Sequence, residues 1–202
     1  MKVCYITHLP NLTGANQSML DLLRNIDQKE VEPYVLLGKH GPLEDELKKI
    51  NVKYRVIRYT NEIKKGHSKV HSIVKKIINI IALFEICHFL KKEHIDLIHN
   101  NSFLVGIGMS AARKMNIPYI CHLRDFIWED HKIILENPNE QIQNLKNATI
   151  AIAVSNAVKS KYIKQIDNDN IRVLYDGIDC NKYLLEDNER KDVFSVQNNI
   201  SL

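Results

Sequence analysis

The sequence lacks several patterns that would place it in a class at once. Its four cysteines, Cys4, Cys87, Cys121 and Cys180, have no CxxC spacing, which argues against a zinc site. Three of them fall in predicted strands or helices, where a thiol packs as a small hydrophobic side chain. No basic run is long or interleaved with aromatic residues, so a nucleic-acid partner is not indicated.

Long apolar runs are also absent. The richest apolar stretch, residues 77–90, is interrupted by Asn79, Glu85 and His88 and is too short to cross a bilayer. The N-terminus runs straight into a predicted strand, without the apolar segment and cleavage site of a signal peptide. We therefore expect a reducing, cytoplasmic location.

The composition is ordinary for a soluble globular protein, with 45% hydrophobic and 26% charged residues. A chain of 202 residues can bury a sizeable core as one domain. The formal net charge of +4 is mild. It permits an anionic partner such as a nucleotide, phospholipid or sugar phosphate without requiring one.

Short apolar runs alternate with helical patterns along most of the chain. The runs predict strands at 3–6, 34–37, 54–57, 96–99, 118–121, 149–154 and 171–175. This alternation predicts the α/β class, with a single Rossmann-like, doubly wound, mostly parallel sheet of about seven strands. Regular periodicity ends after Tyr183, so we expect a domain at 1–183 and a linker or truncated tail at 184–202.

A long helix is predicted at about 69–92, and its apolar residues form one broad stripe. The stripe consists of Val70, Ile73, Val74, Ile77, Ile80, Ile81, Phe84, Cys87 and Leu90. More apolar residues lie off the stripe than a solvated face needs: Ile78, Ala82, Ile86 and Phe89. Two interpretations follow. The helix is wedged between the sheet and a neighbour, or it lies partly on a membrane surface beside the lysines.

Polar residues gather where predicted strands end, which is where ligands bind in open parallel sheets. His122, Arg124 and Asp125 follow the fifth strand, and Asn101 and Ser102 follow the fourth. Each of these residues also has a purely structural interpretation. His122 would be a structural histidine, and Arg124 and Asp125 would form a simple Arg–carboxylate pair. Asn101 and Ser102 would cap the loop with their amide and hydroxyl groups. We predict that the side chain of His99, inside the fourth strand, is satisfied within the sheet.

Gly14 opens the first helix directly after the first strand. A glycine there lets backbone N–H groups and the positive helix end approach a phosphate, although a tight turn explains it equally well. It stands without the GxGxxG pattern of nicotinamide-binding domains, and the pair Gly106 and Gly108 follows a different strand. A nicotinamide-binding protein is therefore a poor interpretation.

Four segments in order resemble a known family: 13–20, 96–102, 117–125, and 152–158 together with 175–179. They are similar to the glycine loop, the "DlvHaHs" strand end, the "HxRD" segment, and the "aVSeav" and "yNGID" segments of glycosyltransferase family 4. The chain thus resembles the N-terminal, acceptor-side domain of such an enzyme, whose architecture is called GT-B.

The resemblance implies a nucleotide-sugar donor, a polysaccharide or lipid-linked acceptor, and transfer with retention of anomeric configuration. It implies no cofactor and no metal. His122 matches the catalytic histidine beside the transferred sugar. The donor- or acceptor-binding residues it implies are Gly14, Ala15, Asn16, Asn101, Ser102, Arg124 and Asp125.

This sequence departs from the family pattern at Thr13, where a glycine is usual, and at Asp176, where an asparagine is usual. The family's second Rossmann-like domain, with its Glu-x7-Glu motif, has no counterpart after Asp179. We therefore expect half an enzyme, inactive without a C-terminal domain or partner chain. The alternative is a non-catalytic, acceptor-binding subunit that needs a separate donor-binding chain.

Overall fold

The computed structural model describes residues 1–7, 9–64, 69–127, 129, 132–166 and 170–177. These residues form a seven-stranded sheet in the order β3-β2-β1-β4-β5-β6-β7, and every neighbouring pair is parallel. The strands are β1 (Lys2–Thr7), β2 (Glu32–Leu37), β3 (Lys53–Val56), β4 (Leu97–Asn100), β5 (Tyr119–Leu123), β6 (Ile150–Ala153) and β7 (Ile171–Val173). The predicted Rossmann-like fold is confirmed.

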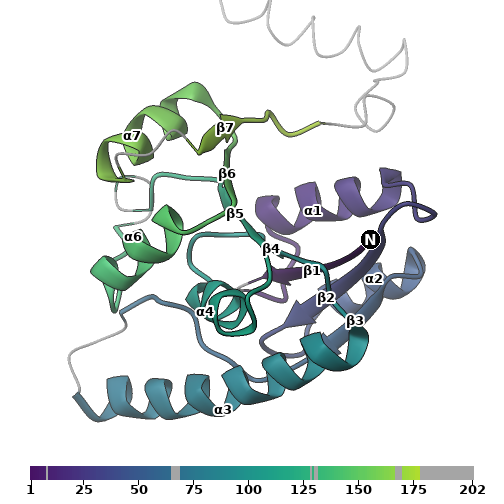
Figure 1. Ribbon diagram of the computed structural model, residues 1–202, viewed down its shortest axis with the longest axis horizontal. Coiled ribbons are helices and arrows are strands. Elements are labelled where there is room, and N and C mark those ends of the chain that lie inside the picture. Colours follow the sequence, from purple (N-terminus) through teal and green to yellow (C-terminus); the bar gives the residue numbers. More distant parts are fainter. Residues whose placement is uncertain (8, 65–68, 128, 130–131, 167–169, 178–202) are drawn as a thin grey trace, which may run out of the picture.

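Helices cover both faces of this sheet (Figure 1). They are α1 (Gly14–Asn25), α2 (Leu43–Lys49), α3 (Lys69–Glu93), α4 (Gly106–Met115), α6 (Pro138–Lys146) and α7 (Asn156–Ile166). Alternate residues of β1 face opposite layers, as the period of two in a strand requires. Val3 and Tyr5 pack with α1 and α2, whereas Cys4 and Ile6 pack in the larger core with α3, α4, α6 and α7.

Helix α4 lies very close to the sheet, as its small residues predict. A Cβ atom added to Gly108 would lie 2.0 Å from Asn100 Oδ1 and 2.9 Å from Ile6 Cδ1. Helix α7 is capped at its start by Ser155, whose Oγ accepts a hydrogen bond from the backbone N–H of Val158 at 3.2 Å. Strand β7 is shorter than predicted, and Leu174 and Tyr175 beyond it are exposed.

The predicted buried stripe of α3 is wrong for most of its length. Its members Val70, Ile73, Val74, Ile77, Ile80, Ile81 and Phe84 are between 47% and 68% exposed. The helix instead buries Ala82, Ile86 and Phe89, with Leu90 of the predicted stripe. The periodic pattern did not identify the buried face, because α3 is apolar nearly all round and two apolar stripes could each face the core. The small Ala82 side chain is buried in the contact with the core.

No helix in the described part of the chain is long and apolar enough to span a membrane.

Candidate functional site

The order of the strands creates a crevice at the carboxyl edge of the sheet. From β1 the chain moves outward to β2 and β3, and then returns to the other side of β1 at β4. Strands β1 and β4 therefore form the topological switch point, where ligands bind in open α/β sheets. The loops that follow β1, β4 and β5 meet here, so the structure brings the predicted site segments together.

Arg124 joins three of these segments. Its Nε and Nη2 groups donate to the backbone and side-chain oxygens of Asn101, at 3.1 and 3.0 Å. Its Nη1 group donates to Ser18 Oγ at 3.0 Å and to Asp176 Oδ2 at 2.9 Å. The side chain is only 9% exposed. Burial lowers the pKa of Arg124, and the nearby carboxylates of Asp176 and Asp125 act in the opposite direction.

Arg124 thus forms an ion pair with Asp176, a carboxylate other than the Asp125 that the sequence suggested. Asp176 replaces the family's asparagine, and its full charge compensates the buried guanidinium. The pair links the exit of β7 to the centre of the site.

Two of the predicted binding residues have side chains that hold the loops in place. Asn16 is fully buried, and its amide donates to the carbonyl oxygens of Leu9 and Asn11, both at 2.8 Å. Its Oδ1 accepts from Thr7 Oγ1 at 2.6 Å and from Asn101 Nδ2 at 3.2 Å. These amides therefore fix the entry to α1 from within. The loop-capping alternative also describes the nearby Ser102, whose Oγ accepts from the backbone N–H of Leu104 at 3.2 Å.

Two cavities open around the pair formed by Arg124 and Asp176, and both residues line each of them. The first, which we call the α1 cavity, measures about 610 Å³ and is also lined by Thr13, Gly14, Ala15 and Asp125. The second, the His122 cavity, measures about 670 Å³ and is also lined by Ser18, Leu22, His122, Leu174 and Tyr175. The single site predicted from the sequence is therefore divided by an ion pair.

The α1 cavity combines a helix N-terminal end with charged side chains of both signs, Arg124, Asp125 and Asp176. Its wall includes the N-terminal end of α1, where the first N–H groups have no intrahelical partners and the helix dipole is positive. The first turn carries no acidic residue. Among the described residues, buried Thr13 Oγ1 has no hydrogen-bond partner, and nothing lies within 4 Å of a Cβ atom added to Gly14. The open space beside Gly14 leaves room for a ligand, and the Thr13 hydroxyl is a polar group that could bind it.

His122 presents a neutral imidazole to the second cavity. Its Nδ1 atom lies 3.3 Å from Nε2 of His99, while its own Nε2 is buried without a partner. Burial, and then the charge of Arg124, lower the pKa of His122 from the ordinary 6.5 to about 3. The ring therefore acts as a neutral hydrogen-bonding group at physiological pH. The prediction that His99 is satisfied within the sheet is confirmed.

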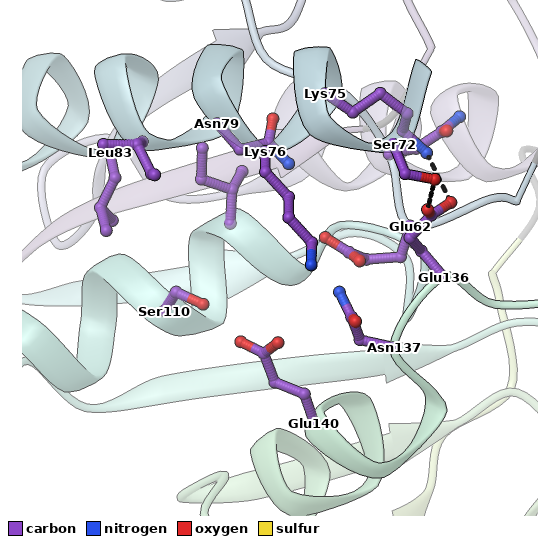
Figure 2. A pocket seen from close by; sticks show the side chains of 13 residues that line it. Glu62, Ser72, Lys75, Lys76, Asn79, Leu83, Ser110, Glu136, Asn137 and Glu140 are labelled. Carbon is purple, nitrogen blue, oxygen red and sulfur yellow. Dashed lines mark hydrogen bonds and ion pairs between the residues drawn. The ribbon is translucent and has the colours of Figure 1, made fainter. Parts of the chain in front are cut away.

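A third cavity, of about 300 Å³, lies behind the loop that carries Asn61 and Glu62, between α3, α4 and the start of α6 (Figure 2). Lys75 crosses its upper wall, donating to the carbonyl oxygen of Ile63 at 2.7 Å and pairing with Glu136 at 3.5 Å. Burial, with the charge of Glu140 second, raises the pKa of Glu62. No sequence signal indicated this cavity, because its residues come from segments far apart in the chain.

Some predictions lie outside the described residues. These include the last residues of the 175–179 segment and the tail at 184–202. Among the residues that the structure does describe, no three His, Cys, Asp or Glu side chains gather as a possible metal site.

A family model identifies the family of this chain. The sequence model of Glycosyltransferase Family 4 matches residues 12–182. The chain is 26% identical over 190 residues to UDP-Gal:alpha-D-GlcNAc-diphosphoundecaprenol alpha-1,3-galactosyltransferase from Escherichia coli, covering 91% of this chain and 46% of that protein.

Solved structures share the fold. Anabaena HepE in complex with UDP has a TM-score of 0.71 at 18% identity, covering 98% of this chain and 50% of HepE. A glycosyltransferase from Rickettsia africae has a TM-score of 0.66 at 16% identity, covering 99% of this chain and 50% of that one. The chain therefore spans about half the length of the relatives it matches, which confirms one half of a GT-B fold.

Proposed function

Because this chain belongs to glycosyltransferase family 4, we propose that it forms the acceptor-side half of an enzyme that transfers a sugar from a nucleotide-sugar donor. The observation that carries the proposal is the pair of cavities that meet at Arg124 and Asp176, at the switch point of the sheet. One cavity offers an anion site and the other offers a neutral histidine. A sugar linked to a diphosphate needs both kinds of contact.

We assign the donor diphosphate to the α1 cavity and the transferred sugar to the neighbourhood of His122. The N-terminal end of α1, Thr13 and the backbone of Gly14 and Ala15 would bind phosphate oxygens. His122 Nε2 would hydrogen-bond a sugar hydroxyl, and Asp125, which lines the α1 cavity, would orient an acceptor hydroxyl. In the retaining mechanism that we propose, the departing phosphate takes the proton of the acceptor.

The likeness to named proteins supports a particular donor and acceptor class. The E. coli relative is named for a UDP-galactose donor and an acceptor linked to diphosphoundecaprenol, and solved HepE structures contain UDP or UDP-glucose. We propose a UDP-sugar donor and a glycan or lipid-linked acceptor for this chain as well.

A second domain is required by this proposal. Leu22, Leu174 and Tyr175 line the His122 cavity and yet are exposed among the described residues, which suits a surface that another domain or chain covers. We propose that a second Rossmann-like domain closes the cleft here. Without it, transfer falls to a small fraction of the normal rate, because positioning both substrates supplies much of the catalysis.

The test is a titration of the 202-residue chain with UDP, UDP-sugars and a polyprenyl-diphosphate-linked glycan, by calorimetry and by transfer of radiolabelled sugar. We expect binding without ordinary turnover, and restored turnover when a chain carrying a Glu-x7-Glu Rossmann domain is added. The variant His122→Ala should weaken sugar-nucleotide binding more than UDP binding. Ordinary turnover by the chain alone would refute the half-enzyme proposal.

A non-catalytic acceptor-binding subunit makes a different prediction in the same experiment. It would bind the glycan acceptor with full affinity and show no affinity for UDP or UDP-sugars. The anion-binding character of the α1 cavity favours the enzyme.

The exposed apolar face of α3 supports a further proposal, that this chain docks on the inner face of a membrane that holds its acceptor. Ile77, Ile80, Ile81 and Phe84 are exposed. They belong to α3, the long helix at the edge of the molecule in Figure 1. Lys76 lies on the same helix, and Lys114 lies over the ring of Phe84 at 4.3 Å. Apolar residues beside lysines are typical of helices that bind anionic bilayers in the interface.

Flotation with vesicles that contain an anionic phospholipid tests this surface. The double variant Ile77→Glu/Ile81→Glu should reduce vesicle binding by about tenfold or more, since two apolar side chains that would enter the bilayer become charged. Ile134→Glu is the matched control, because Ile134 is equally exposed but lies outside α3. Equal flotation of the double variant and the control would contradict membrane docking by α3.

A further inference from the structure

Three rings form a row across the central strands of the sheet. Tyr5 of β1 is in register with His99 of β4, and their ring centroids lie 4.9 Å apart. His99 is in register with Ile120 of β5, so His122, two residues further on, points to the same face. The centroids of His99 and His122 lie 5.4 Å apart with an interplanar angle of 33°.

The two histidines are closely coupled and isolated from solvent. His99 is 6% exposed and His122 is 4% exposed, and the Nε2 atom of His99 lies 3.3 Å from Nδ1 of His122. Burial is the main cause that lowers the pKa of each ring to about 3, so both are neutral. One hydrogen bond between two neutral rings contains one proton, donated by one nitrogen and accepted by the other.

This bond determines what His122 can offer to a ligand. In a neutral imidazole one nitrogen carries the proton and the other accepts, so the state of Nδ1 sets the state of Nε2. If His99 donates to Nδ1, then Nε2 carries a proton and donates. If His99 accepts from Nδ1, then Nε2 is an acceptor. In both cases Nε2 is the ring nitrogen that has no partner among the described residues, and His122 lines the cavity.

We propose that His99 is a positioning residue that holds His122 in one tautomer and one ring orientation for hydrogen bonding to the transferred sugar. The inference rests on the proposed function, because it takes His122 as the group that contacts the sugar. His99 itself does not touch the substrate. Tyr5 packs against the far side of His99 and keeps its ring aligned with the row.

Two substitutions separate positioning from packing. His99→Phe keeps a ring of similar size between Tyr5 and His122 but removes both nitrogens. His99→Gln places an amide near the position of Nε2 and retains a group that can donate or accept. If His99 matters only as packing, the phenylalanine variant should behave as the wild type. If it positions His122, the glutamine variant should be the better substitute.

The first readout is independent of any sugar. In the 202-residue chain labelled with ¹⁵N in histidine, nitrogen–proton correlation spectra report the tautomer of each neutral ring. We expect one tautomer for His122 in the wild type and in His99→Gln, and a mixture of both in His99→Phe. An unchanged single tautomer in His99→Phe would overturn the proposal.

The second readout is binding measured by calorimetry with UDP and UDP-glucose as probes. His99→Phe should weaken UDP-glucose binding by about three- to tenfold while leaving UDP binding unchanged, and His99→Gln should recover most of the loss. Equal affinities in all three proteins would also overturn the proposal. If the wild type binds neither probe, the proposed function fails, while the tautomer spectra still decide the role of His99.

Discussion

Acid should destabilise this protein through His99 and His122 in particular. The pKa of each is depressed from 6.5 to about 3 in the folded state, chiefly by burial. Between those two values the unfolded chain binds more protons than the folded chain. Stability is therefore greatest above pH 6.5, and it falls as the pH decreases from 6.5 toward 3.

The size of the effect follows from these values. At pH 5.5 an unfolded histidine with a pKa of about 6.5 is mostly protonated, whereas its folded counterpart here is not. Each ring then lowers the free energy of unfolding by about 1.4 kcal/mol relative to pH 7.5, and the pair lowers it by about 3 kcal/mol. This is a large part of the stability of a typical domain.

Urea unfolding at pH 7.5 and pH 5.5, followed by circular dichroism, measures the difference. Wild type should lose the full amount, His99→Gln about half of it, and the double variant His99→Gln/His122→Gln almost none. The quantity to compare between the three proteins is the change in unfolding free energy from pH 7.5 to pH 5.5. The other titrating groups contribute equally to this change in each protein, so their contribution cancels. An equal loss in the wild type and the double variant would refute a neutral histidine pair.

Two further predictions concern charge and packing. Asp176→Asn should lower the free energy of unfolding by about 1 kcal/mol, because Arg124 loses a partly exposed ionic partner. It should also strengthen UDP binding several-fold, because the positive charge of Arg124 is left uncompensated between the cavities. Calorimetry should show that this gain in affinity disappears at high salt, and weaker UDP binding by the variant would contradict the prediction. Gly108→Ala should lower the free energy of unfolding, measured by urea titration, by about 1–3 kcal/mol, since the added Cβ would overlap Asn100 Oδ1. Gly14→Ala is the control, because its Cβ would lie in open space, and it should not destabilise the fold. An equal effect of both substitutions would contradict the close approach of α4 to the sheet.

The sequence was a good guide wherever a feature depends on local order along the chain. Alternating strands and helices, strand-end polar residues and the cap at Ser155 follow from backbone periodicity and from hydrogen bonds between near neighbours. The parallel sheet and the position of the site at its carboxyl edge followed in turn. The resemblance to glycosyltransferase family 4 is confirmed by the match over residues 12–182.

The buried face of α3 was not predictable in the same way. Two apolar stripes on one helix are equivalent until a neighbour is present, and the buried face includes the small Ala82 as well as Ile86 and Leu90. The partners of Arg124 come from α1, β4 and the exit of β7, and no spacing in the sequence relates these segments.

The sequence by itself therefore determined the class of fold and the polar residues that gather at the carboxyl edge of the sheet. Only the tertiary structure decided how those residues are used: Asn16 inside the loop, Arg124 and Asp176 between two cavities, and His99 paired with His122. The reason is physical. Periodicity reports which way a side chain points, whereas hydrogen bonds, ion pairs and pKa shifts depend on distances that strand order and register set between remote parts of the chain.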